Sequence, residues 1–206
     1  STAPDGTYSD LPGFTEAGNH TVYYKASADN HADASGSFTF TVNKQTVPAP
    51  AIAGKVYNGQ LLTADITDGD LYTVTKNEGG TEGGEYDVEL TLKDPANYKW
   101  ESTEDAALTL KFAITPADNS WIAEPGIDGW TYGSTPNAPV MGEAVSGAVS
   151  VKYVGTDNSG NAYDSAERPL QAGAYKAVFT AAATGNYGAL TKEVPFTISR
   201  AALTDS

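Results

Sequence analysis

The sequence predicts an all-β protein built from tandem small antiparallel β-sandwich modules. Three observations predict this class: side-chain types alternate with a period of two over many short segments, Gly and Asn cluster between those segments, and one pattern occurs three times. Patterns typical of helices are nearly absent. The recurring pattern contains no reactive side chains, so it describes a building element and not an active site.

Each copy of the pattern has the same three markers. A glycine followed by an aromatic residue or His opens the copy, in residues 17–20, 83–86 and 172–175. An Asn followed by an aromatic residue or His comes next, as Asn30-His31, Asn97-Tyr98 and Asn186-Tyr187. An apolar strand closes each copy and contains Phe40, Phe112 or Phe196. The Asn-to-Phe distance is longer in the second copy than in the first and third, so the second copy carries an insertion.

The repeat divides the chain into one incomplete module and two complete ones. We expect the C-terminal part of a module in residues 1–44, complete modules in residues 45–116 and 117–200, and the start of a linker or a further module in residues 201–206. Modules of roughly 70 to 85 residues bury only a little over 60% of their unfolded surface, so each core should be small. The connectors are short, which predicts a semi-rigid array with the complete modules end to end.

Individual strands follow from alternation and from Val, Thr, Tyr and Phe content. We expect strands in residues 21–25, 86–92, 149–154 and 175–180 and at the end of each copy, and a hairpin in residues 149–164 with Asp157-Asn158-Ser159-Gly160 at its tip. The side chains expected to face inward are Tyr23, Phe40, Val88, Leu90, Phe112, Val178 and Phe196. The recurring tyrosines, Tyr8, Tyr86, Tyr163 and Tyr175, are expected to pack flat and hydrogen-bond the backbone.

Short strands separated by polar turns at these intervals indicate a sandwich of the immunoglobulin-like (Ig-like) type. Small β-grasp-like modules are the alternative architecture. The first copy lacks its opening half, so it should expose a strand edge and an apolar face. We therefore expect self-association through the incomplete first module, or packing of that module against the second copy.

Charge and composition exclude several partners. The chain has 26 acidic and 12 basic residues, a formal net charge of -14, which repels nucleic acid and anionic lipid. Its apolar segments are only strand-length, so we expect no membrane insertion. It contains no Cys. The absence of Cys is compatible with a reducing cytosol. In a β repeat rich in Gly, Thr, Tyr and Asp it fits equally well an extracellular location on a bacterial cell surface, which we favour.

The combination of motifs resembles the short Ig-like, MBG/YDG-type repeat modules that occur in tandem in bacterial cell-surface proteins. The residues that carry the resemblance are Val56-Tyr57-Asn58-Gly59, Trp130-Thr131-Tyr132-Gly133, Ala172-Gly173-Ala174-Tyr175, Gly185-Asn186-Tyr187 and Phe196-Thr197-Ile198. The resemblance implies a non-catalytic structural spacer or adhesive stalk. It carries over no catalytic residue and no cofactor.

The sequence offers no constellation for catalysis or metal binding. The only imidazoles, His20 and His31, lie where the other copies have Tyr, which indicates aromatic packing in place of a general base. The acidic residues near Asp68 and Asp157 match no complete Ca²⁺ loop with a bidentate Glu. We therefore expect a protein that is not an enzyme, with no catalytic residue, no metal site and no cofactor.

Exposed aromatic rings are the one feature that could bind a ligand. The candidate ligand-binding residues are Trp100, Tyr98, Trp130 and Tyr132. Trp100 lies at the start of the insertion, where a loop side chain is often exposed, although covering the end of a small core is the commoner role of such a Trp. The partner would be a host or cell-wall glycan or a protein. The alternative function is a carbohydrate-binding accessory region of a secreted glycan-degrading enzyme, which requires a planar row of exposed aromatic rings.

Overall fold

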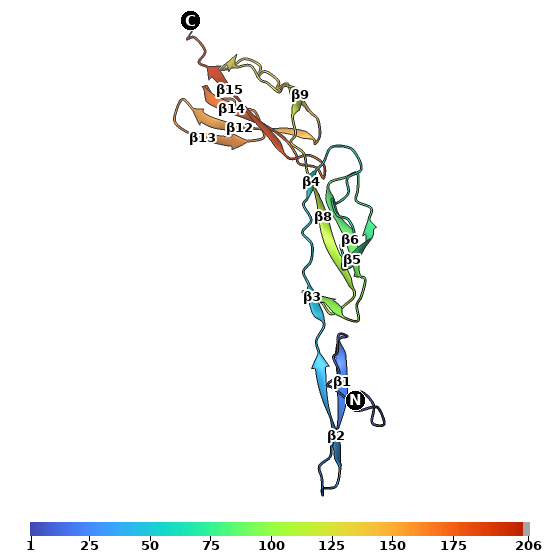
Figure 1. Cartoon of the computed structure of the whole chain (residues 1–206). Coiled ribbons are helices and arrows are strands. Elements are labelled where there is room, and N and C mark those ends of the chain that lie inside the picture. Colours follow the sequence, from blue (N-terminus) through green and yellow to red (C-terminus); the bar gives the residue numbers. More distant parts are fainter. Residues whose placement is uncertain (204–206) are drawn as a thin grey trace. The chain divides into compact units, whose positions relative to one another are not determined.

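The computed structural model describes residues 1–203, and these residues form an all-β protein (Figure 1). They contain fifteen strands arranged in five sheets. No helix is present in this part of the chain, so none is long and apolar enough to span a membrane. The predicted all-β class is confirmed, and the sheets are consistent with a sandwich-type fold.

The first copy contributes one antiparallel pair, β1 (Gly18–Ala26) and β2 (Ala34–Val42). Two strands alone are marginally stable in water. Ser1 lies along the edge of β1, where its backbone exchanges hydrogen bonds with Tyr23 at 3.0 and 2.9 Å. The Phe14 ring contacts the rings of His20 and Phe40, with centroids 4.4 and 5.2 Å away. These contacts cover part of the apolar face of the pair.

The second copy forms a four-stranded sheet and a small parallel pair. The sheet has the order β4 (Lys55–Val56), β8 (Ala107–Thr115), β6 (Gly84–Leu92) and β5 (Tyr72–Asn77), and β4 is parallel to β8. The parallel pair is β3 (Gln45–Val47) with β7 (Tyr98–Trp100). Val88, Leu90 and Phe112 are each 0% exposed, as their inward-facing pattern predicts.

The third copy forms a five-stranded sheet and a two-stranded pair. The sheet order is β10 (Trp130–Thr131), β15 (Leu190–Ser199), β14 (Gly173–Ala181), β12 (Val149–Asp157) and β13 (Ala162–Ser165). The pair is β9 (Trp121–Ala123) with β11 (Glu143–Ala144). Strands β12 and β13 form the predicted hairpin, in register from Thr156 opposite Ala162.

Phe196 is the centre of the core of the third copy. Its ring stacks on Trp130 and Tyr175, with centroids 5.3 and 5.7 Å away, and meets Tyr153 edge-on at 6.1 Å. Ile127, Ala177, Phe179 and Ile198 complete this cluster of buried side chains. A large apolar ring packed against other rings explains why Phe suits this position in the third copy.

The three opening strands are structurally equivalent. β1, β6 and β14 each span nine residues and start at a glycine. Two residues after that glycine, His20 Nε2 donates to the Glu16 carbonyl at 2.7 Å and Tyr175 Oη donates to the Gln171 carbonyl at 2.9 Å. Both bonds reach four residues back along the chain. His20 therefore takes the place of a tyrosine in this contact, as the sequence comparison of the copies indicates.

Two of the predicted inward-facing residues lie one position out of register. Val22 is 3% exposed and Ala177 is 0% exposed, whereas their neighbours Tyr23 and Val178 are only partly buried. In a strand, a shift of one residue exchanges the two faces. Alternation fixes which residues share a face, but it does not decide which of the two faces is buried.

Contacts divide the described chain into two compact units. One comprises Ser1–Ala53, Thr63–Gly79 and Tyr86–Phe112, and the other comprises Gly54–Leu62, Gly80–Glu85 and the residues from Ala113 onward. The division therefore runs through the second copy and does not follow the sequence repeat. Segments of the second copy cluster with the third copy, and other segments of it cluster with the first.

Asp157 organises the tip of the β12–β13 hairpin. Its carboxylate accepts hydrogen bonds from the Ser159 N–H at 2.8 Å and from the backbone N–H and side-chain amide of Asn161, both at 2.9 Å. These bonds, the one from the Asn161 amide foremost, lower the pKa of Asp157. A lowered carboxyl pKa means that the charged form stabilises the fold.

This stabilisation should be lost in acid. It is present above the pKa of an unfolded Asp, about 3.9, and disappears as the pH falls through the lower pKa of the folded state. NMR shifts of the Ser159 and Asn161 amides should therefore titrate with a midpoint below that value, and Asp157→Asn should abolish the titration. A midpoint at or above the unfolded value would contradict the proposed bonding.

Removal of a core ring should have a large effect on stability. Phe112→Ala leaves a cavity in a fully buried site, so we expect the free energy of unfolding to fall by about 3 to 5 kcal/mol. Phe38→Ala is the matched control, because Phe38 also lies on a closing strand but is 49% exposed. Urea unfolding of both variants measures the difference, and equal losses would show that Phe112 is not a core residue.

Candidate functional site

Trp100 does not present a binding surface. Its side chain is 1% exposed, its indole N–H donates to the Ala106 carbonyl at 3.0 Å, and its ring lies 5.7 Å from that of Tyr72. Of the two roles that the sequence allows for Trp100, an exposed loop side chain or a cover for a small core, the structure shows the second. The insertion folds so that its first aromatic residue fills the core of the second copy, where a buried indole with a satisfied N–H is stable.

The other three candidate aromatic residues differ in exposure. Trp130 is 8% exposed and belongs to the core around Phe196. Tyr98 is half-buried on β7. Tyr132 is 46% exposed and retains an accessible ring. A flat sugar-binding surface needs several accessible ring faces, and neither tryptophan provides one.

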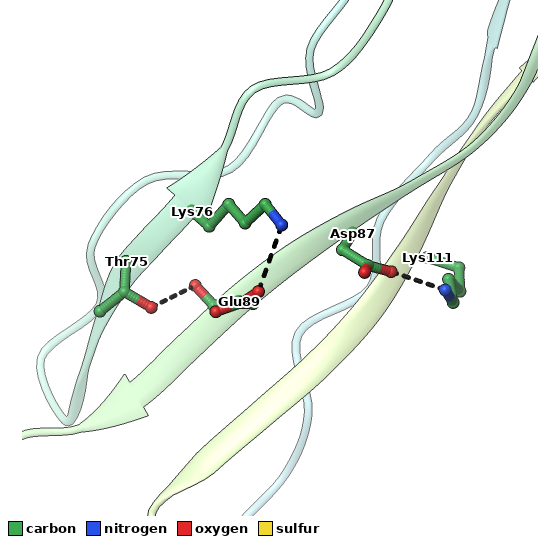
Figure 2. A network of polar contacts seen from close by, with 5 residues as sticks. All are labelled: Thr75, Lys76, Asp87, Glu89 and Lys111. Carbon is green, nitrogen blue, oxygen red and sulfur yellow. Dashed lines mark hydrogen bonds and ion pairs between the residues drawn. The ribbon is translucent and has the colours of Figure 1, made fainter.

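Polar contacts link side chains of β5, β6 and β8 (Figure 2). Lys111 Nζ lies 2.6 Å from the Asp87 carboxylate, Lys76 lies 3.4 Å from Glu89, and the Thr75 hydroxyl donates to the Glu89 carbonyl at 3.0 Å. The ion pair with Lys111 lowers the pKa of Asp87. These are cross-strand pairs between exposed side chains.

The other copies also have exposed cross-strand polar pairs, but the residues differ. The first copy has a hydrogen bond between the hydroxyls of Thr21 and Thr39 on its β1–β2 pair, and the third has an ion pair between Lys176 and Glu193 on β14 and β15. Exposed pairs of this kind contribute about 0 to 1 kcal/mol each. The outer faces are therefore solvated surfaces that tolerate different residues.

One contact does recur, and it links consecutive copies. Asn97, in the second copy, accepts a hydrogen bond at Oδ1 from the Ala17 N–H of the first copy at 2.7 Å. Its Nδ2 donates to the carboxylate of Glu16. Its backbone carbonyl accepts from the N–H of Gln45, the first residue of β3, at 2.9 Å. Asn97 thus binds the two residues just before β1 in the first copy and also Gln45, in the connector between the first and second copies.

Asn186 makes the same three contacts between the second and third copies. Its Oδ1 accepts from the Gly83 N–H at 2.7 Å, its Nδ2 donates to the carboxylate of Glu82, and its carbonyl accepts from the Ala117 N–H at 2.8 Å. We call each set an asparagine joint: Glu16, Ala17, Gln45 and Asn97 form the first, and Glu82, Gly83, Ala117 and Asn186 the second. Each joint lies wholly inside one compact unit.

The carboxamide suits this position because it carries a donor and an acceptor on one small group. The partly buried N–H of Ala17 or Gly83 needs an acceptor, and the adjacent Glu needs a donor. Aspartate could not donate to a carboxylate, and Ala, Ser or Thr could not reach both partners. The Asn–Glu bond is charge-assisted, which strengthens it over a bond between neutral groups.

Each joint also has contacts of its own. In the first, Asp94 accepts from Asn97 Nδ2 at 2.9 Å, and Lys44 Nζ donates to the Pro95 carbonyl at 2.6 Å. In the second, the rings of Tyr57 and Tyr187 meet edge-on with centroids 5.5 Å apart. A Cβ atom on Gly83 would lie 1.9 Å from the Gly185 carbonyl oxygen, so the backbones approach closely there.

The joints have the chemistry of a structural contact. They combine amides, carboxylates and backbone groups, and no nucleophile paired with a general base lies in them. Within the described residues, no three His, Cys, Asp or Glu side chains come together in a way that could hold a metal ion. What this arrangement can do is hold one copy against the next.

Sequence reasoning identified the Asn-aromatic pairs as markers of the repeat but assigned them to turns. It missed Glu16 and Glu82, although both precede the opening glycine by two residues, as Gln171 does in the third copy. This shared spacing is the signal that was present. The partner of each Asn lies in the preceding copy, 81 or 104 residues away, so no local pattern reveals it.

Comparisons of the chain with protein-family models, with curated proteins and with solved structures found no match.

Removal of either joint asparagine should release the amide that it holds. Asn97→Ala leaves the Ala17 N–H without an acceptor, and Asn186→Ala does the same to Gly83, so we expect each change to cost about 1 to 3 kcal/mol of stability. Hydrogen exchange should accelerate at Ala17 in one variant and at Gly83 in the other. Asn158→Ala, at an exposed hairpin tip, is the control and should change neither amide. Unchanged exchange in the joint variants would exclude the asparagine contact.

Proposed function

We propose that this chain is a non-catalytic structural spacer or adhesive stalk segment of a bacterial cell-surface protein. The observation that supports the proposal is that the same three hydrogen bonds join the first copy to the second and the second to the third. A contact used twice with the same atoms is a connecting device of a tandem array, in which stability comes from each copy and from its neighbour contacts.

The joint is suited to limit the motion of consecutive copies. Three hydrogen bonds, two from the side chain and one from the backbone of a single Asn, fix both the preceding copy and the connector at Gln45 or Ala117. A connector that is itself hydrogen-bonded has little freedom to swing. Limited swing is what a spacer requires to keep its ends apart.

Composition supports an extracellular array. The net charge of -14 favours solubility at an exposed surface, and the lack of Cys means that the chain depends on packing and joints in place of disulfides. The carbohydrate-binding alternative loses support, because the rings of Trp100 and Trp130 are buried. Tyr132 is the one of the four candidates whose ring is exposed in this structure.

Small-angle scattering tests the spacer property. A compact globule of 206 residues has a radius of gyration of about 17 Å, and a spacer should be well above that value. The double variant Asn97→Ala/Asn186→Ala should populate a broader range of distances between its ends, whereas Asn158→Ala should scatter like the native chain. A radius near that of the compact globule for the native protein would contradict the proposal.

Antibody labelling of intact cells tests the location. An antibody raised against this chain should label intact cells that produce the full-length protein, without permeabilisation. Labelling that requires permeabilised cells would exclude a surface role and leave the scattering result unaffected.

A further inference from the structure

We propose that the third copy presents an open half of an asparagine joint, and that it takes the Asn-aromatic pair of a further copy of the repeat that follows in the same polypeptide. This inference rests on the proposed function and names the partner of one surface. The open half-joint comprises Tyr132, Gln171, Ala172 and Ala201.

The open half-joint lies at the same sequence position in the third copy as the Glu-containing halves of the two complete joints do in the first and second copies. Gln171-Ala172 precedes Gly173 as Glu16-Ala17 precedes Gly18 and Glu82-Gly83 precedes Gly84. Ala201 follows the closing strand at the position of Gln45 and Ala117, three residues after the last apolar residue of that strand. The Tyr132 N–H donates to the Ser199 carbonyl at 2.8 Å, as the Tyr57 N–H donates to the Thr115 carbonyl at 2.8 Å.

The donors that an asparagine would satisfy are present and open. Within residues 1–203, the N–H groups of Ala172 and Ala201 have no hydrogen-bond acceptor, whereas those of Ala17, Gly83, Gln45 and Ala117 all bond to an Asn. A cavity of about 410 Å³ lies here, lined by all four half-joint residues and by the hairpin tip at Asp157 and Asn158. The exposed ring of Tyr132 lies at this cavity, in the role that Tyr57 has toward Tyr187.

The chemistry specifies the occupant. An Asn Oδ1 would accept from Ala172, its carbonyl would accept from Ala201, and the aromatic residue after it would contact the Tyr132 ring. Gln171 replaces the glutamate of the filled joints, and its Oε1 accepts from an Asn Nδ2 without a charge. In both filled joints the Asn comes from the copy that follows directly in the chain, which is why we assign the same source here.

The test extends the chain by one copy. Residues 117–206 are placed a second time after Arg200, so that the added Ala117 takes the position of Ala201. Hydrogen exchange measured by NMR should slow at Ala172 by roughly tenfold or more relative to the native chain, because its N–H becomes bonded. Gln171→Glu in the extended chain should slow it further, since the bond then becomes charge-assisted.

A matched variant separates the joint from simple folding of the added copy. Asn186→Ala in the added copy alone should restore fast exchange at Ala172, while slow exchange persists in the strands of the added copy and at Gly83. Fast exchange at Ala172 in the extended chain, with the added strands protected, would overturn the proposal.

The remaining possible result is that the half-joint binds a second molecule of this protein. If Ala172 of the native chain is already protected in a concentration-dependent manner, and Asn30→Ala abolishes that protection, the half-joint accepts a second molecule and the assignment to the following copy is wrong. Each of these two negative results would overturn only the proposal for the open half-joint. The spacer proposal is decided separately by scattering and by labelling of intact cells.

Discussion

The arrangement of this protein depends on one small group, the carboxamide of a recurring asparagine. It satisfies a backbone N–H that the opening strand of the preceding copy cannot satisfy itself, and it gives the neighbouring glutamate a donor. The backbone of the same asparagine binds the connector. Because an unsatisfied, partly buried N–H is costly, each copy gains stability from the copy that follows.

The compact units do not coincide with the sequence repeat. The first joint lies in the unit that contains the first copy, and the second joint lies in the unit that contains Gly54–Leu62, Gly80–Glu85 and the third copy. Stability of such an array is a sum of the intrinsic terms of the copies and the terms of their contacts. With small cores and no disulfide, the contact terms are a substantial share of the total.

The sequence predicted the features that depend on local pattern. Alternation located β1, β6 and β14, the Asp157–Gly160 tip located the hairpin, and the recurring Phe located the cores around Phe112 and Phe196. It failed where the outcome depends on contacts between distant residues. Alternation did not decide which face of β14 is buried, so Ala177 was missed. The position of Trp100 in an insertion left exposure and core packing both open. The partners of Asn97 and Asn186 lie in another copy.

Every complete joint is made of two unlike halves, a Glu-containing half offered by one copy and an Asn-containing half offered by the next. The second copy carries both halves, one at each of its joints. A genetic event that duplicates or deletes a whole copy of this kind therefore leaves each remaining junction with one half of each type. The array can therefore change its length by whole repeats without creating a mismatched interface. A break inside a copy would instead leave an unpaired backbone amide at the site of the break.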